Sequence, residues 1–133
     1  MNHVLVIDTS FIMSDLLPDE NGNEIDLALY SIHVPALFYL ECSNVLQVAL
    51  KRKRIKNADF KEYLQVLNGL PINVDKFSAT SESLYSISKL SQEHDLTSYD
   101  AAYLELAIRL GAKLATCDFN LKKAAGKNNI TTF

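Results

Sequence analysis

The most informative segment of the chain is Leu96-Thr97-Ser98-Tyr99-Asp100-Ala101-Ala102-Tyr103-Leu104-Glu105-Leu106-Ala107, which begins with polar residues and continues almost wholly apolar to Leu110. Its second half contains two charged side chains, Glu105 and Arg109, which lie four residues apart and can pair on one helix face. A helix that is apolar nearly all round is buried. The segment therefore predicts a buried helix over 98–110, with Asp100 in its first turn and Gly111 as its C-terminal stop.

Asp100 is a carboxylate in an apolar setting, and such groups are rarely buried without a partner because desolvating a charge is costly. Similar settings surround three other acids, Asp8, Glu41 and Asp118. We interpret the four acids as a cluster around a metal ion. The alternative for Asp100 is a capping box with Thr97, in which the acid only satisfies backbone N–H groups at the start of the helix.

The composition is that of an ordinary globular protein, with 133 residues, 48% hydrophobic and 22% charged. No apolar run approaches the roughly 18 residues of a membrane span, and no basic segment of a signal peptide precedes the first apolar run. We therefore expect a single cytoplasmic domain over 1–133, with Cys42 and Cys117 as small buried side chains. The net charge of -3 neither indicates nor excludes nucleic-acid binding, because bound cations would reverse the field of a carboxylate cluster.

Strands and helices alternate along the chain. The continuous apolar run at 4–7 is typical of a parallel strand covered on both faces. We expect strands at 3–7, 31–34, 72–74 and 113–116, with a fifth at 130–133. Helices are expected at 11–17, 24–30, 36–53, 57–67, 80–93, 98–110 and 121–125, with a loop at 18–23. This order predicts an α/β/α fold of three layers with a mainly parallel, four- to five-stranded sheet.

The helix over 36–53 carries an apolar stripe, on which we place Leu40 and Val48. Glu41 and Asn44 interrupt this stripe on a shared face, which favours a functional role over an edge position open to solvent. The basic run Lys51-Arg52-Lys53-Arg54 closes the helix. It either complements the negative end of the helix dipole or contacts the phosphates of a nucleic acid.

The four acids are expected at one edge of the sheet. Asp8 and Asp118 each follow a strand, and ligand sites of open α/β sheets lie beyond the C-terminal strand ends. Four carboxylates repel one another unless a cation compensates, and oxygen ligands suit Mg²⁺ or Mn²⁺. Such a cluster suits phosphodiester hydrolysis, because a bound metal lowers the pKa of its water and holds the phosphate.

Five segments together resemble a known family. They are Val6-Ile7-Asp8-Thr9-Ser10, Pro35-Ala36-Leu37, Glu41-Cys42-Ser43-Asn44-Val45-Leu46, Leu96 through Leu104, and Leu114-Ala115-Thr116-Cys117-Asp118 through Leu121. In this order they resemble PIN-domain endoribonucleases, particularly the VapC type of bacterial toxin–antitoxin systems. The segment around Asp100 is the most specific of them.

The resemblance implies a Mg²⁺- or Mn²⁺-dependent endoribonuclease toxin that forms homodimers and is inhibited by a small antitoxin protein. Transfer RNA and other structured RNAs are the substrate classes to test first. The implied site consists of the catalytic and metal-binding acids Asp8, Glu41, Asp100 and Asp118, with support from Ser10, Thr116, Asn44 and Asn120. For Ser10 and Thr116 the alternative is capping of a helix or turn.

Two other functions compete with this one. The first is a module that keeps the fold and the acids but binds RNA or protein without turnover. The second is a phosphoryl-transfer receiver domain, which is expected to carry paired acids after its first strand. Here Asp8 alone follows that strand, which disfavours a receiver domain.

Overall fold

The fold is built on a four-stranded parallel sheet, described by a computed structural model that covers residues 3–17 and 25–133. The strands are β1 (Val4–Ile7), β2 (Ser31–Pro35), β3 (Ile72–Asp75) and β4 (Lys113–Ala115), in the order β3-β2-β1-β4. β1 lies between β2 and β4 and its Leu5, Val6 and Ile7 are fully buried, as a strand covered on both faces requires. The predicted α/β class with a parallel sheet is confirmed.

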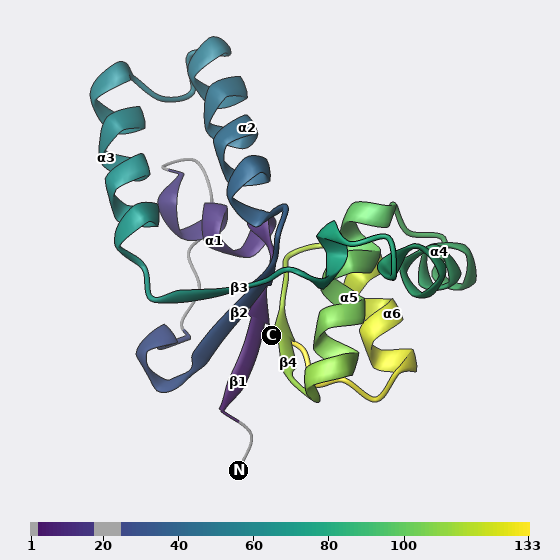
Figure 1. The fold of residues 1–133 in the computed structure, drawn as a ribbon. Helices are drawn as coiled ribbons and strands as arrows, with labels where there is room; N and C mark the ends of the chain where they lie inside the picture. The colour runs from purple at the N-terminus through teal and green to yellow at the C-terminus, as the bar shows by residue number, and fades with distance from the viewer. Residues whose placement is uncertain (1–2, 18–24) are drawn as a thin grey trace.

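Helices cover both faces of the sheet (Figure 1). One group contains α1 (Thr9–Leu16), α2 (Phe38–Lys51) and α3 (Asn57–Gly69), and the other contains α4 (Ser83–His94), α5 (Ser98–Leu110) and α6 (Phe119–Lys127). Two short 3-10 turns, η1 (Leu27–Leu29) and η2 (Phe77–Ala79), connect them to the strands. Within the described ranges no helix is long and apolar enough to cross a membrane.

The central helix α5 has the predicted bounds. Its residues from Ala101 to Ala107 are all buried, and it packs on β1, β2 and β4. Thr97 caps its N-terminus by accepting a hydrogen bond from the Asp100 N–H at 3.1 Å. Gly111 ends it in the left-handed conformation, at φ 60°, where a side chain would be strained.

Arg109 ties α5 to the end of β3. Its guanidinium donates 3.0 and 2.8 Å hydrogen bonds to the two carboxylate oxygens of Asp75. It also donates to Glu105 at 2.7 Å, so the predicted pair on α5 is confirmed. Glu105 is only 7% exposed, and this pairing compensates the burial of its charge.

Several predicted details are wrong. Pro35 ends β2, and α2 begins at Phe38 rather than 36. The buried residues of α2 are Phe38, Cys42, Leu46 and Ala49, so Leu40 lies on the opposite side and is 76% exposed. A helix that packs on one side only buries a narrow stripe, and apolar residues outside that stripe remain in solvent.

The C-terminal segment also differs from its prediction. α6 continues through Gly126 to Lys127, with Asn128 as its C-terminal cap, because Gly is tolerated inside a helix when packing favours it. The predicted fifth strand is reduced to one parallel bridge between Leu114 and Thr132. The predicted helix at 24–30 is present only as η1, while residue 24 and the predicted loop at 18–23 lie outside the described residues.

Candidate active site

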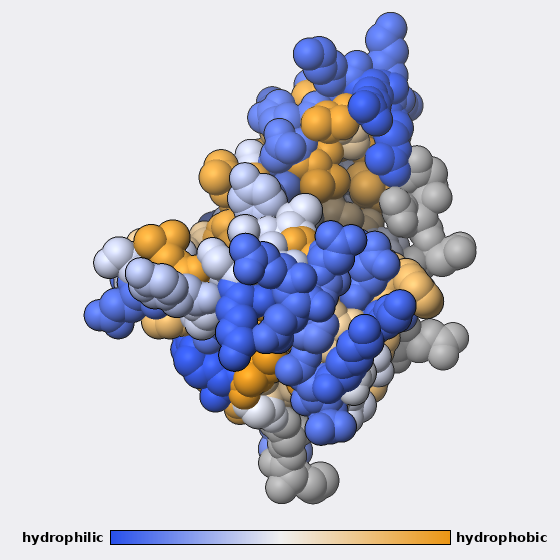
Figure 2. Space-filling view, turned by 90° about the vertical axis from the view of Figure 1, so that its right-hand side faces the viewer, coloured by the Kyte–Doolittle hydropathy of each residue, from blue (hydrophilic) through white to orange (hydrophobic). Residues whose placement is uncertain are grey.

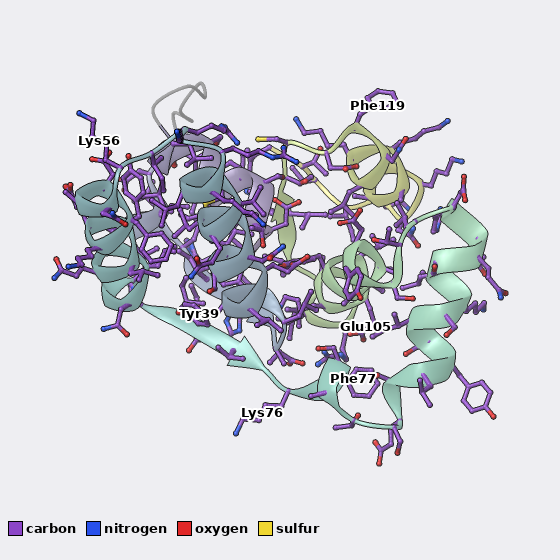
Figure 3. All side chains as sticks on the ribbon, turned by 90° about the horizontal axis from the view of Figure 1, so that it is seen from above. Tyr39, Lys56, Lys76, Phe77, Glu105 and Phe119 are labelled. Atoms are coloured by element: carbon purple, nitrogen blue, oxygen red, sulfur yellow. The ribbon has the colours of Figure 1, made fainter. Side chains whose placement is uncertain are left out.

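An acidic cavity of about 370 Å³ lies at the C-terminal ends of β1 and β4, the edge that Figure 3 views from above. Four different helix starts bring acids to it. Asp8 and Asp118 are the N-terminal caps of α1 and α6, whereas Glu41 and Asp100 lie in the first turns of α2 and α5. All four predicted acids line this one cavity.

Asp8 is the most firmly held of the four acids. One of its carboxylate oxygens accepts from the Ser10 hydroxyl at 2.7 Å and from the Phe11 N–H at 2.9 Å. The other oxygen accepts from the Thr116 hydroxyl. Burial raises the pKa of Asp8, while these three hydrogen bonds act in the opposite direction.

Ser10 and Thr116 join the ends of β1 and β4. Besides donating to Asp8, the Ser10 hydroxyl accepts from the Cys117 N–H at 3.0 Å. The Thr116 hydroxyl likewise accepts from the Asp118 N–H at 3.0 Å. Each hydroxyl therefore fixes the Asp8 carboxylate relative to the turn that carries Asp118, which is more than capping of a local turn.

The other three acids influence the ionisation of Asp100. Its pKa is raised to about 6, first by burial and then by the negative charges of Asp118, Asp8 and Glu41. Thr97 supplies the cap of α5, and among the described residues no backbone N–H donates to the Asp100 carboxylate. The geometry therefore does not favour the capping-box alternative for Asp100.

Two hydroxyl groups that were not predicted from the sequence hold Glu41. The Tyr103 hydroxyl donates to Glu41 Oε1 at 2.6 Å, and Thr9 donates to the same oxygen at 3.3 Å. Tyr103 is only 1% exposed, and in the sequence it looks like another core residue of the apolar helix α5. The available signal was its position three residues after Asp100, which places both side chains on one face of the helix.

The remaining predicted residues are divided between this cavity and other places. Asn44 and Arg54 line the acidic cavity. Lys51 lines a neighbouring hollow beside α2, Arg52 caps the end of α2, and Lys53 turns the chain at φ 61°. Asn120 is exposed and lines a separate cavity against the end of α4, so the structure does not bring it to the four acids.

The two cysteines behave differently, contrary to the prediction that both are buried. Cys42 is 1% exposed, and burial raises the pKa of its thiol to about 12. Cys117 is exposed and lines the acidic cavity. Cys117 lies in the turn between β4 and α6, outside the buried strand.

The acidic cavity offers the oxygen donors that Mg²⁺ and Mn²⁺ prefer. Glu41 and Asp118 each form their hydrogen bonds through one carboxylate oxygen, and within the described ranges the other oxygen of each has no partner. Across those same ranges, no group of three or more acidic, His or Cys side chains is close enough to hold an ion without rearrangement. Mg²⁺ needs only one or two direct carboxylates because it keeps several waters, so the donor set fits such an ion.

Comparison with known proteins identifies the family and relatives that match most of the chain. Residues 5–127 match the sequence profile of the PIN domain. The chain is 29% identical to VapC ribonuclease Mb0985 of Mycobacterium bovis over 118 residues, which is 89% of this chain and 88% of that protein. It is also 29% identical to ribonuclease VapC3 of Pyrobaculum aerophilum over 120 residues, which is 88% of this chain and 91% of that protein.

Solved structures share the fold. PAE2754 from Pyrobaculum aerophilum superposes with a TM-score of 0.66 at 20% identity, covering 90% of this chain and 78% of the other. FitAcB from Neisseria gonorrhoeae superposes with a TM-score of 0.63 at 16% identity, covering 97% of this chain and 96% of the other. At these identities the similarity concerns the fold of the chain.

Proposed function

The chain belongs to the PIN domain family, and from this we propose that it is a divalent-metal-dependent endoribonuclease, the toxin of a toxin–antitoxin pair. The observation that carries the proposal is the convergence of four carboxylates on one cavity, where burial and then the charges of the other three raise the pKa of Asp100. A bound cation relieves this repulsion at neutral pH while leaving all four acids ionised. The relatives named as ribonucleases span nearly the full length of the chain and support RNA as the substrate.

We assign Asp8, Glu41, Asp100 and Asp118 as the residues that hold Mg²⁺ or Mn²⁺. When bound, such an ion supplies an activated water and neutralises the charge of the phosphodiester. The chain's own contribution is to orient these acids. Ser10 and Thr116 fix Asp8 against the turn of Asp118, and the Tyr103 hydroxyl fixes Glu41 Oε1 so that Oε2 remains for the ion.

Substrate contacts at the mouth of the site are assigned to α2 and the turn that follows it. Asn44 and Arg54 line the cavity, where an amide and a guanidinium suit the oxygens of a phosphate. We propose that Lys51, Arg52 and Lys53 add weaker contacts to the RNA backbone. The same proposal includes a homodimer, a small antitoxin partner and action in the cytoplasm.

The test is a digest of total RNA and of purified transfer RNA by the purified protein. We expect cleavage with Mg²⁺ or Mn²⁺, no cleavage with EDTA, and none with Asp8→Asn or Asp118→Asn. Cleavage that persists in EDTA would exclude the metal-dependent function. RNA that is bound but never cut, with either metal, would instead indicate the binding module without turnover.

A further inference from the structure

Phe119 is an aromatic residue that the fold leaves in solvent beside the acidic cavity. It directly follows Asp118, is the first residue of α6, and is 75% exposed. α6 packs on the rest of the protein through Leu121, Ala124 and Ala125, so the fold does not use the Phe119 ring. Figure 3 shows this ring projecting outward from α6. Single exposed apolar residues are common, so the significance of this one depends on its location.

The helix that carries Phe119 also carries three lysines. α6 contains Lys122, Lys123 and Lys127 and no acid. Lys123 and Lys127 line a polar cavity together with Asn120, while the opposite wall comes from the end of α4 and includes Glu93 and Asp95. In the described part of the chain neither Lys123 nor Lys127 forms an ion pair. The view onto this side of the molecule is mostly hydrophilic (Figure 2).

A lone aromatic ring among lysines, one residue from a phosphodiester-cleaving site, has the chemistry of a single-stranded nucleic-acid contact. Such contacts combine a positively charged track for the backbone with an aromatic face for a base. Tyr99 provides a contrast, because it also precedes a site acid and is 64% exposed. It lines an apolar groove with Leu37 and Leu84, and no lysine contributes to that groove.

We propose that Phe119 is a base-stacking platform for the nucleotide next to the scissile phosphate, and that the strand continues along the lysine-bearing side of α6. This inference rests on the proposed endoribonuclease function and makes it more specific. A base can stack on Phe119 only when it is not stacked inside a helix, so the RNA is single-stranded at the cleavage position. In a structured RNA the target is then a loop or a bulge.

Binding of a short single-stranded RNA, measured in EDTA so that nothing is cleaved, tests the proposal. A 2-aminopurine base in the RNA reports stacking through the quenching of its fluorescence. We expect Phe119→Leu to raise Kd roughly 5- to 100-fold and to remove the quenching, since base–aromatic stacking contributes that much. Phe119→Trp should restore both. Tyr85→Leu, at an 87% exposed aromatic on α4 outside the site, is the matched control and should bind like the parent.

A series of RNAs with single abasic positions identifies the stacked base. The effect of Phe119→Leu should vanish when that base is missing and persist at all other positions. An unchanged Kd for Phe119→Leu, an equal effect at every abasic position, or a parent protein that binds no single-stranded RNA would each overturn the inference. So would a leucine variant that keeps its RNA affinity but loses inhibition by a partner protein, because this result would assign Phe119 to a protein contact.

The proposed function can fail independently of this inference. Stacking that depends on Phe119, in a protein that cuts no RNA with Mg²⁺ or Mn²⁺, would refute the nuclease and keep the platform. Equal kcat/KM for the parent and Phe119→Leu on a single-stranded substrate would refute the platform and keep the nuclease.

Discussion

Replacing Asp100 by Asn removes one negative charge from the acidic cavity and keeps the shape of the side chain. In the folded protein the pKa of Asp100 is about 6, compared with 3.8 for an unperturbed Asp. Two pKa units correspond to about 3 kcal/mol, and partial exposure reduces this to about 1–2 kcal/mol. Without metal, the Asn variant should therefore be more stable than the parent at neutral pH, with Tm higher by about 3–8 °C.

The pH dependence has a definite sign. Because folding raises the pKa of Asp100, its ionised form destabilises the folded state. This cost is absent below about pH 4, grows between about pH 4 and 6, and is complete above pH 6. The stability advantage of Asp100→Asn should follow the same window, largest at pH 7.5 and absent near pH 4. Thermal unfolding in EDTA at several pH values measures it.

Added Mn²⁺ should reverse the order of stability. The ion binds the folded parent protein and stabilises it, whereas it stabilises the variant much less because the variant lacks one of the charges that attract the ion. The Mn²⁺ concentration for half-maximal RNA cleavage should rise at least about tenfold in the variant, since even residues behind metal ligands have effects of this size. Glu62→Gln, at an exposed acid on α3, also removes one negative charge, but outside the cavity. It should change neither Tm nor the Mn²⁺ concentration for half-maximal cleavage. An Asp100→Asn protein with the parent's Tm in EDTA and the parent's cleavage at low Mn²⁺ would refute the reasoning and favour the capping box.

Three further changes test the fold and the site. Arg109→Gln leaves Glu105 buried without its partner and should lower the free energy of unfolding in urea by about 3 kcal/mol. Lys89→Gln, in an exposed pair, should lower it by under about 0.5 kcal/mol. Equal losses would contradict the buried pairing. Tyr103→Phe removes the hydroxyl that holds Glu41 and should raise the Mn²⁺ concentration for half-maximal cleavage about tenfold. An Mn²⁺ titration like that of the parent would show that the tyrosine serves only packing. Replacing residues 51–54 by Gln should lower the log–log salt slope of RNA binding by about 0.7 for each phosphate that the protein no longer neutralises, and an unchanged slope would make the run a helix terminus only.

The sequence predicted best what local chemistry determines. The bounds of α5 followed from an apolar run between Thr97, a good N-terminal cap, and Gly111, a good C-terminal stop. The prediction that Asp8 and Asp118 lie at the same edge of the sheet followed from a general property of parallel sheets, whose strands all end on one side. Neither inference needed the tertiary packing.

The sequence predicted least well what depends on one-sided packing. Leu40 and Val48 are exposed at 76% and 36% because α2 buries a narrow stripe, and periodicity alone does not identify which apolar residues fall outside it. The role of Tyr103 was missed because its hydroxyl meets Glu41 across 62 residues of sequence. A contact of this kind depends on the relative placement of two helices, which no local pattern encodes.

The position of β4 has a consequence for the synthesis of the protein. β4 pairs with β1, the first strand, and the hydroxyls of Ser10 and Thr116 connect residues more than a hundred positions apart. A growing chain that has not yet released Lys113 and the residues after it therefore lacks both Asp118 and the support of Asp8. Until then the edge of β1 stays unpaired, and such long-range pairing is among the slower steps of folding. The proposed metal site is therefore completed only after β4 and Asp118 have left the ribosome, long after β1 and Asp8 have done so.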